Sequence, residues 1–130
     1  MKERIETQKY FTVEDCNTNP DKQYIFGDNL IFQGTAGQAI IRECKNAVGV
    51  PTKRLPSMSN KAFFSDRPDE FKKVSTALNN LNILYITGKT LVFPEDGLGT
   101  GRAMLKKKSP LIYKLIDDFL KTNFELEIQP

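Results

Sequence analysis

The sequence predicts a single α/β domain in which short strands and longer helices alternate along the chain. The chain has 130 residues, which fits one domain whose core needs no disulfide or metal for its stability. Its 39% hydrophobic and 27% charged residues are typical of a soluble globular protein. Short apolar runs that end in glycine-containing loops, separated by segments of helical spacing, indicate the alternation.

The first part of the chain contains two predicted strands with one helix between them. Residues 1–22 are polar, and we expect them to form a segment at the periphery of the domain. Residues 24–26 predict a short buried strand, and residues 38–45 predict a helix because their apolar side chains can share one face. The alternation of Val48 and Val50 marks a second short strand, which we expect to end at the following proline.

The strongest helix start in the chain follows. Ser65 or Asp66 can cap a helix, and Pro68 suits its first turn. Residues 83–86 fit either a continuation of this helix or a short strand, and Gly88 ends the element in both cases. The apolar residues that keep helical spacing are Phe71, Val74, Leu78 and Leu81.

The last part of the chain predicts a strand, a helix and a terminal strand. Residues 91–93 form the strand, and Ser109 and Pro110 cap and start the helix. Residues 125–128 alternate between polar and apolar side chains, as a terminal or edge strand does. The apolar face of the helix comprises Leu111, Leu115, Ile116, Phe119 and Leu120.

Composition excludes several kinds of site. The chain has no histidine, and its two cysteines, Cys16 and Cys44, form no C-x-x-C motif. These absences exclude the common zinc sites and the nucleophiles that depend on histidine. We therefore expect neither a metal nor a cofactor, and we expect both cysteine thiols to be reduced. The charged N-terminus does not have the apolar core expected of a signal peptide, and no apolar run has the length expected of a membrane span. We therefore expect a cytoplasmic monomer without membrane contact, located in the host cytoplasm if a phage encodes it.

The net charge of +3 fits a phosphate-bearing ligand but is small for a dedicated nucleic-acid binder. The densest basic cluster is residues 106–108, which are all lysine. This cluster is either a solvated loop or a contact for phosphate groups.

Two glycine segments carry the functional prediction. The early glycine segment, residues 27–38, follows the first strand, and the late glycine segment, residues 94–102, follows the third. Loops after strand ends form the usual ligand crevice of α/β sheets, and glycine lets backbone N–H groups approach an anion closely. We therefore predict that the two segments face each other and hold one nucleotide-sized ligand.

Each polar group in these segments also has a structural interpretation. Asp28 and Asn29 fit either a turn or a ligand contact. Lys53 and Arg54 are either exposed cations or a charge at the ligand. A lysine amine attacks an electrophilic carbon only when it is deprotonated, which burial or a neighbouring cation favours. Residues 95–96, a glutamate and an aspartate, fit surface charges or one general acid or base.

The order of these motifs resembles the macrodomain superfamily, which binds ADP-ribose. The matching segments are residues 26–29, 34–39, 50–54 and 94–101, within a likeness that covers roughly residues 24–120. The likeness is closest to the branch that contains the DNA ADP-ribosyl glycohydrolase antitoxins, and extends to small macrodomain-like proteins of phages and bacteria.

This resemblance implies a three-layer α/β/α domain around a mixed central sheet. It implies Asn29 at the distal ribose, residues 34–37 along the ribose and diphosphate, and residues 97–101 around the phosphates. Lys53 matches the lysine that acts on the ribose anomeric carbon in the DNA-directed branch. The predicted ligand-binding residues are Gly27, Asp28, Asn29, Gly34, Thr35, Ala36, Gly37, Gln38, Thr52, Asp96, Gly97, Leu98, Gly99, Thr100, Gly101 and Arg102, and the predicted catalytic residue is Lys53.

Three functions remain open at this point. The first is binding of ADP-ribose with hydrolysis of an ADP-ribosyl linkage on a nucleobase, in which case ADP-ribosylated DNA is a partner. The second is binding of a nucleotide metabolite without catalysis. The third is a small phage interaction protein of the same fold without a working pocket.

Overall fold

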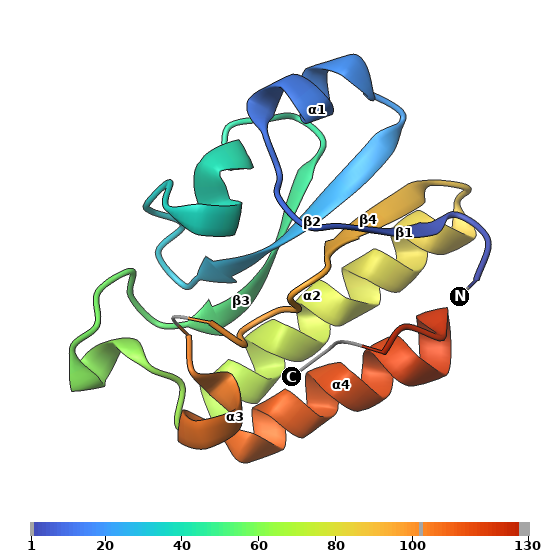
Figure 1. Cartoon of the computed structure of the whole chain (residues 1–130). Coiled ribbons are helices and arrows are strands. Elements are labelled where there is room, and N and C mark those ends of the chain that lie inside the picture. Colours follow the sequence, from blue (N-terminus) through green and yellow to red (C-terminus); the bar gives the residue numbers. More distant parts are fainter. Residues whose placement is uncertain (1, 102, 128–130) are drawn as a thin grey trace.

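The computed structural model describes residues 2–101 and 103–127, which form one compact α/β domain (Figure 1). Its strands are β1 (Ile5–Gln8), β2 (Lys22–Asn29), β3 (Ala47–Lys53) and β4 (Thr90–Pro94). Its α-helices are α1 (Val13–Thr18), α2 (Pro68–Ile86), α3 (Leu105–Lys108) and α4 (Pro110–Phe124). Two 3₁₀ turns, η1 (Gly37–Ile41) and η2 (Asn60–Ala62), lie in the connections on either side of β3.

The four strands form one sheet in the order β1-β4-β2-β3, and every pairing between them is parallel. This corrects the expected mixed sheet. Each connection between successive strands contains a helix or 3₁₀ turn, so each strand re-enters the sheet in the same direction. Of the residues predicted to form a terminal strand, 125–127 lie outside any strand, and 128 is outside the described residues. The carboxyl ends of all four strands therefore lie at one edge of the sheet.

Side chains that alternate along the strands supply two separate cores, one on each face of the sheet. Ile25 of β2 and the pair Leu91 and Phe93 of β4 pack against α2 and α4. Tyr24 and Phe26 of β2 face the other way, toward α1 and η1. Figure 1 shows α2 and α4 together on one side of the sheet and α1 on the opposite side.

The two long helices match their predicted apolar patterns with small differences. Helix α2 continues through residues 83–86, which resolves the alternative in favour of helix, and buries Val74, Leu78 and Leu81. Helix α4 buries Ile112, Ile116, Leu120 and Phe124, whereas Leu111 is 59% exposed. The predicted face is thus confirmed at Ile116 and Leu120, and Leu115 and Phe119 pack partly buried against the core. The sequence prediction missed Ile112 and Phe124.

The polar N-terminal segment contributes more than was predicted. Ile5 of β1 is buried, and β1 pairs with β4 at one edge of the sheet. Thr12 caps α1, where its hydroxyl accepts the amide of Asp15 at 3.0 Å and the Asp15 carboxylate accepts the Thr12 amide in return.

The two cysteines lie in the core between α1 and the chain after η1, and both are free thiols. Burial, together with a hydrogen bond to the Cys44 thiol, raises the pKa of Cys16 to about 12. Cys16 therefore stays protonated at neutral pH and packs as a small apolar side chain.

Within the described part of the chain, no helix combines the length and apolar composition that crossing a membrane requires.

The start of α4 is held by a residue far away in the sequence. Ser109 occupies the N-cap position, as predicted, but its side chain accepts no helix amide. Its hydroxyl instead donates to Asp66 Oδ1 at 2.5 Å, and the Asp66 carboxylate accepts the amides of Ile112 at 3.1 Å and Leu111 at 3.3 Å. Asp66 therefore caps α4 and ties it to the entry of α2.

We expect Asp66→Ala to lower the free energy of unfolding by about 1–2 kcal/mol, because it removes the acceptor of two helix amides. Urea denaturation followed by circular dichroism measures the change. Asp118→Ala on the exposed side of α4 is the control, since its ion pair with Lys114 is solvated and contributes about 0.5 kcal/mol or less. Equal losses in the two variants would show that Asp66 does not cap the helix.

Candidate functional site

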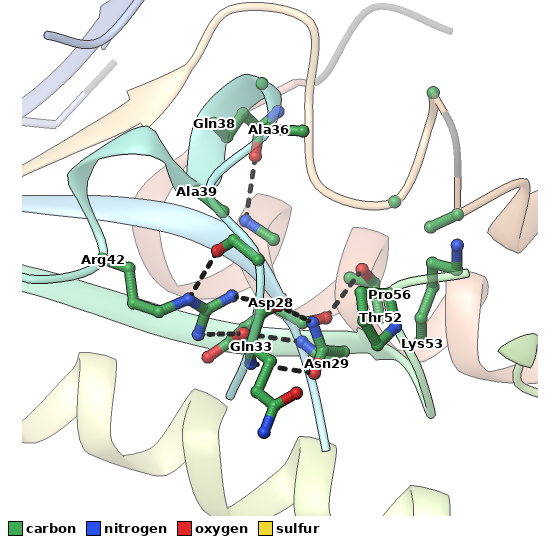
Figure 2. A pocket seen from close by; sticks show the side chains of 16 residues that line it. Asp28, Asn29, Gln33, Ala36, Gln38, Ala39, Arg42, Thr52, Lys53 and Pro56 are labelled. Carbon is green, nitrogen blue, oxygen red and sulfur yellow. Dashed lines mark hydrogen bonds and ion pairs between the residues drawn. The ribbon is translucent and has the colours of Figure 1, made fainter. Parts of the chain in front are cut away.

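A pocket of about 300 Å³ opens at the carboxyl ends of β2 and β3, beside the loop that follows β4. This volume lies at the lower end of the range for small-molecule sites. Figure 2 shows the side chains that line it. The lining residues are Gly27, Asp28, Asn29, Gln33, Gly34, Ala36, Gly37, Gln38, Ala39, Arg42, Thr52, Lys53, Pro56, Gly99, Gly101 and Ala103.

The two glycine segments face each other across this pocket, as the sequence predicted. Gln38 connects them directly, since its side-chain Oε1 accepts the Gly27 amide at 2.9 Å and its Nε2 donates to the Gly97 carbonyl at 3.0 Å. A methyl group at Gly27 would lie 3.9 Å from the Gly99 nitrogen, so the two backbones are close neighbours. The Gln38 side chain thus fixes the separation of the two segments.

Several backbone N–H groups in the pocket lack an acceptor. Among the described residues, the amides of Gly34, Gly37, Gly99 and Gly101 donate to no protein atom, and the lining atoms of a glycine are necessarily backbone. Gly34, Gly37 and Gly101 are exposed and Gly99 is half-buried, so water or an anionic ligand can reach these donors. Glycine amides without acceptors on both sides of one pocket can hold the oxygens of a diphosphate.

An ion pair with little solvent exposure anchors the early glycine segment to the sheet. Arg42 Nη1 lies 2.6 Å from Asp28 Oδ1, and the two side chains are only 10% and 7% exposed. The same guanidinium donates to the carbonyls of Gly34 at 2.8 Å and Gln33 at 3.1 Å, and its carbon lies 5.4 Å from the centre of the Phe26 ring. Arg42 therefore connects the end of β2 to the loop above it, as the dashed lines in Figure 2 show.

Asn29 acts within its own turn. Its Nδ2 donates to the Gln33 carbonyl at 2.7 Å, and its Oδ1 accepts the amides of Ile31 at 3.2 Å and Gln33 at 3.3 Å. The turn interpretation of this residue is therefore confirmed, and Asn29 shapes the pocket wall that the loop forms.

Lys53 ends β3 and lines the pocket, although its side chain is only 7% exposed. Its Nζ donates to the Ser57 carbonyl at 2.5 Å and lies 5.1 Å from the centre of the Phe63 ring. The neighbouring Thr52 hydroxyl donates to the Asp28 carbonyl at 3.3 Å. The β3 end thus offers the pocket one cation held in a defined direction.

Arg54 takes a different direction from Lys53. Its Nη2 lies 2.7 Å from Asp69 Oδ1 and its Nε lies 2.8 Å from Glu70 Oε2, both on α2. A hydrogen bond from this guanidinium holds the pKa of the Asp69 carboxyl below its ordinary value. The two carboxylates of α2 neutralise Arg54, so it is not the neighbouring cation that the sequence suggested for Lys53.

Some predicted site residues lie outside the pocket lining. Leu98 packs its side chain in the core, and Asp96 and Glu95 are exposed to solvent. The Gly97 amide donates to the Pro94 carbonyl within a turn, and the Thr100 hydroxyl donates to the Asp96 carbonyl. Arg102 lies outside the described residues. The predicted residues absent from the lining are thus Thr35, Asp96, Gly97, Leu98 and Thr100.

Sequence reasoning missed five residues that do line the pocket: Gln33, Ala39, Arg42, Pro56 and Ala103. Arg42 is the most important of them because of its contacts with Asp28 and the loop. The one sequence signal for it is an arginine that interrupts a mostly apolar stretch near Ile41. In the part of the chain that the structure describes, no group of acidic, cysteine and histidine side chains could hold a metal ion.

Comparison with known proteins gives a family but no activity. A family model described as "Family of unknown function (DUF7831)" matches residues 6–119. No curated protein matches the chain. No solved structure matches it either.

We expect Arg42→Met to lower the free energy of unfolding by about 3 kcal/mol, because it leaves the Asp28 carboxylate nearly buried without its counter-charge. Urea denaturation measures this loss. The double variant D28N/R42M should recover part of it, since no unpaired charge remains. Additive losses from the two single variants would contradict a direct interaction between these side chains.

Proposed function

This chain belongs to the DUF7831 family of unknown function, and we propose from its pocket that it binds ADP-ribose or a closely related nucleoside diphosphate. The observation that carries the proposal is the set of glycine amides on both sides of one pocket that find no acceptor among residues 2–101 and 103–127. A diphosphate presents several oxygens to such amides at once.

The arrangement of the remaining groups supports the same ligand class. The charges of Asp28 and Arg42 in this pocket match each other, so the glycine amides offer a ligand neutral donors beside the cation of Lys53. Neutral donors suit a diphosphate whose charge is shared among several oxygens. The layering supports a macrodomain-like fold, because one face of the sheet is covered by α2 and α4 and the other by α1 and η1. The sheet itself is parallel in place of mixed.

We expect isothermal titration of the wild-type protein with ADP-ribose to give binding in the micromolar range, and Gly99→Ala to weaken it at least about tenfold. Gly99 has a φ of +78°, and a methyl group there would lie 2.8 Å from Leu105 Cδ2, so the late glycine segment must move.

Gly88→Ala is the matched control. Gly88 also has a positive φ, +99°, but a methyl group there meets nothing within 4 Å. It therefore carries a similar backbone strain without contact to the pocket. No heat at millimolar ADP-ribose, or equal affinity in the Gly99 and Gly88 variants, would refute the proposed binding site.

The position of Lys53 favours a second step, hydrolysis of an ADP-ribosyl linkage to a nucleobase. In this reaction the Lys53 amine, as nucleophile, forms a bond to the ribose anomeric carbon while the bond from that carbon to the base nitrogen breaks. The base leaves with the proton that the amine gives up. Water then forms a bond to the anomeric carbon while the bond from that carbon to the lysine nitrogen breaks, which restores the amine. The contact from Nζ to the Ser57 carbonyl fixes the direction of the amine. A binder without catalysis has the same pocket and leaves the linkage intact.

If the protein hydrolyses an ADP-ribosylated oligonucleotide, Lys53→Met should reduce the turnover by a factor of about 100 or more. Chromatography of released ADP-ribose measures the rate. The control Lys45→Met removes an exposed lysine and should leave the rate unchanged. Turnover that survives Lys53→Met would exclude the lysine mechanism. If the wild type shows no turnover, hydrolysis is refuted and only the proposed binding function remains.

A further inference from the structure

A second pocket of about 480 Å³ lies next to the first and is lined by basic and aromatic residues. Four of its lining residues are cations and none is acidic. They come from three parts of the fold: the loop and η2 after β3, the start of α2, and α3. The lining comprises Arg54, Asn60, Lys61, Phe63, Phe64, Ser65, Arg67 and Lys108. We call this pocket the basic pocket.

Three of these cations are available to an anion. Asp69 and Glu70 neutralise Arg54, whereas no carboxylate among the described residues pairs with Lys61, Arg67 or Lys108. All three of these residues are exposed. Cations gathered in one pocket without counter-charges repel each other, and an anionic ligand relieves that repulsion.

Phe63 forms the boundary between the two pockets. Its ring centre lies 5.1 Å from the Lys53 Nζ of the first pocket and 5.1 Å from the Lys108 Nζ of the basic pocket. Lys53 also forms a β-bridge with Phe63. A molecule whose reacting end reaches Lys53 can therefore continue across Phe63 toward Lys108 without leaving the surface.

We propose that the basic pocket binds the phosphodiester backbone of a single-stranded nucleic acid, whose modified base enters the first pocket. The proposal rests on the function proposed above, because that function places a nucleobase at Lys53. A base stacked in a duplex cannot reach a side chain that is only 7% exposed, so the strand must present it unstacked. Three exposed cations in one pocket supply the electrostatic part of a single-strand groove, whereas Phe63 and Phe64 are buried and leave the bases unstacked.

The test is the fluorescence anisotropy of a labelled 12-nucleotide oligothymidylate titrated with the full chain at several salt concentrations. The wild type should bind, with a slope of log affinity against log salt near −2, since about three phosphates are neutralised at about 0.7 per contact. The triple variant K61Q/R67Q/K108Q should lose at least about tenfold in affinity and most of the slope. Lys89→Gln, an exposed lysine that precedes β4 at the opposite edge of the sheet, is the control and should change neither.

Three results would overturn the proposal: no binding of the oligonucleotide, equal loss in the Lys89 control, or equally tight binding of poly-glutamate of the same charge. Tighter binding of a duplex would overturn its single-stranded part. A parallel titration of the wild type with ADP-ribose separates the two proposals. If the protein binds ADP-ribose but not the oligonucleotide, only the proposed role of the basic pocket is refuted. If it binds the oligonucleotide but not ADP-ribose, only the proposed ligand of the first pocket is refuted.

Discussion

The parallel direction of β2 and its two neighbours is the constraint on which the site depends. Strand β2 lies between β3 and β4, and both pair with it in parallel. Three strand ends therefore meet at one edge, although the loops that leave them are far apart in the sequence. An antiparallel β4 would have sent the late glycine segment to the opposite edge, and an antiparallel β3 would have done the same to Lys53.

Loops without regular hydrogen bonding cannot hold a pocket open by themselves, so side chains do so here. Gln38 connects the early and late glycine segments through both ends of its amide group. Arg42 connects the early segment to β2 through Asp28 and two carbonyls. These side chains bond to some backbone groups of the loops, while neighbouring glycine amides find no acceptor in the part of the chain that the structure describes. The pocket is therefore rigid where it is anchored and open to an acceptor from outside.

The parts of the fold that local pattern determines could be predicted from the sequence. The apolar spacing of α2 and the run that forms β4 specify their own conformations, and the glycines after strand ends indicated the edge where the pocket lies. The sheet direction could not be predicted, because local patterns specify a strand but not its neighbours or their relative direction. The mixed sheet was only what the family resemblance implied. The sequence likewise did not predict that Asp66 caps α4 or that Arg42 pairs with Asp28. Both join residues whose partners depend on the path of the chain, and local spacing carries no signal of that path.

The position of Lys53 illustrates how one strand end can serve two surfaces. Pro51 and the glycine at position 49 precede it in β3, and the β-bridge with Phe63 folds the following loop back against the strand end. The amine is held by the Ser57 carbonyl of this loop, while Phe63 of the same loop faces both Lys53 and Lys108. Any movement of residues 54–63 must therefore alter the direction of the Lys53 amine and the shape of the basic pocket together. This one short segment therefore contributes to the walls of both pockets, and a ligand that displaced it in the basic pocket would also displace the contacts of Lys53.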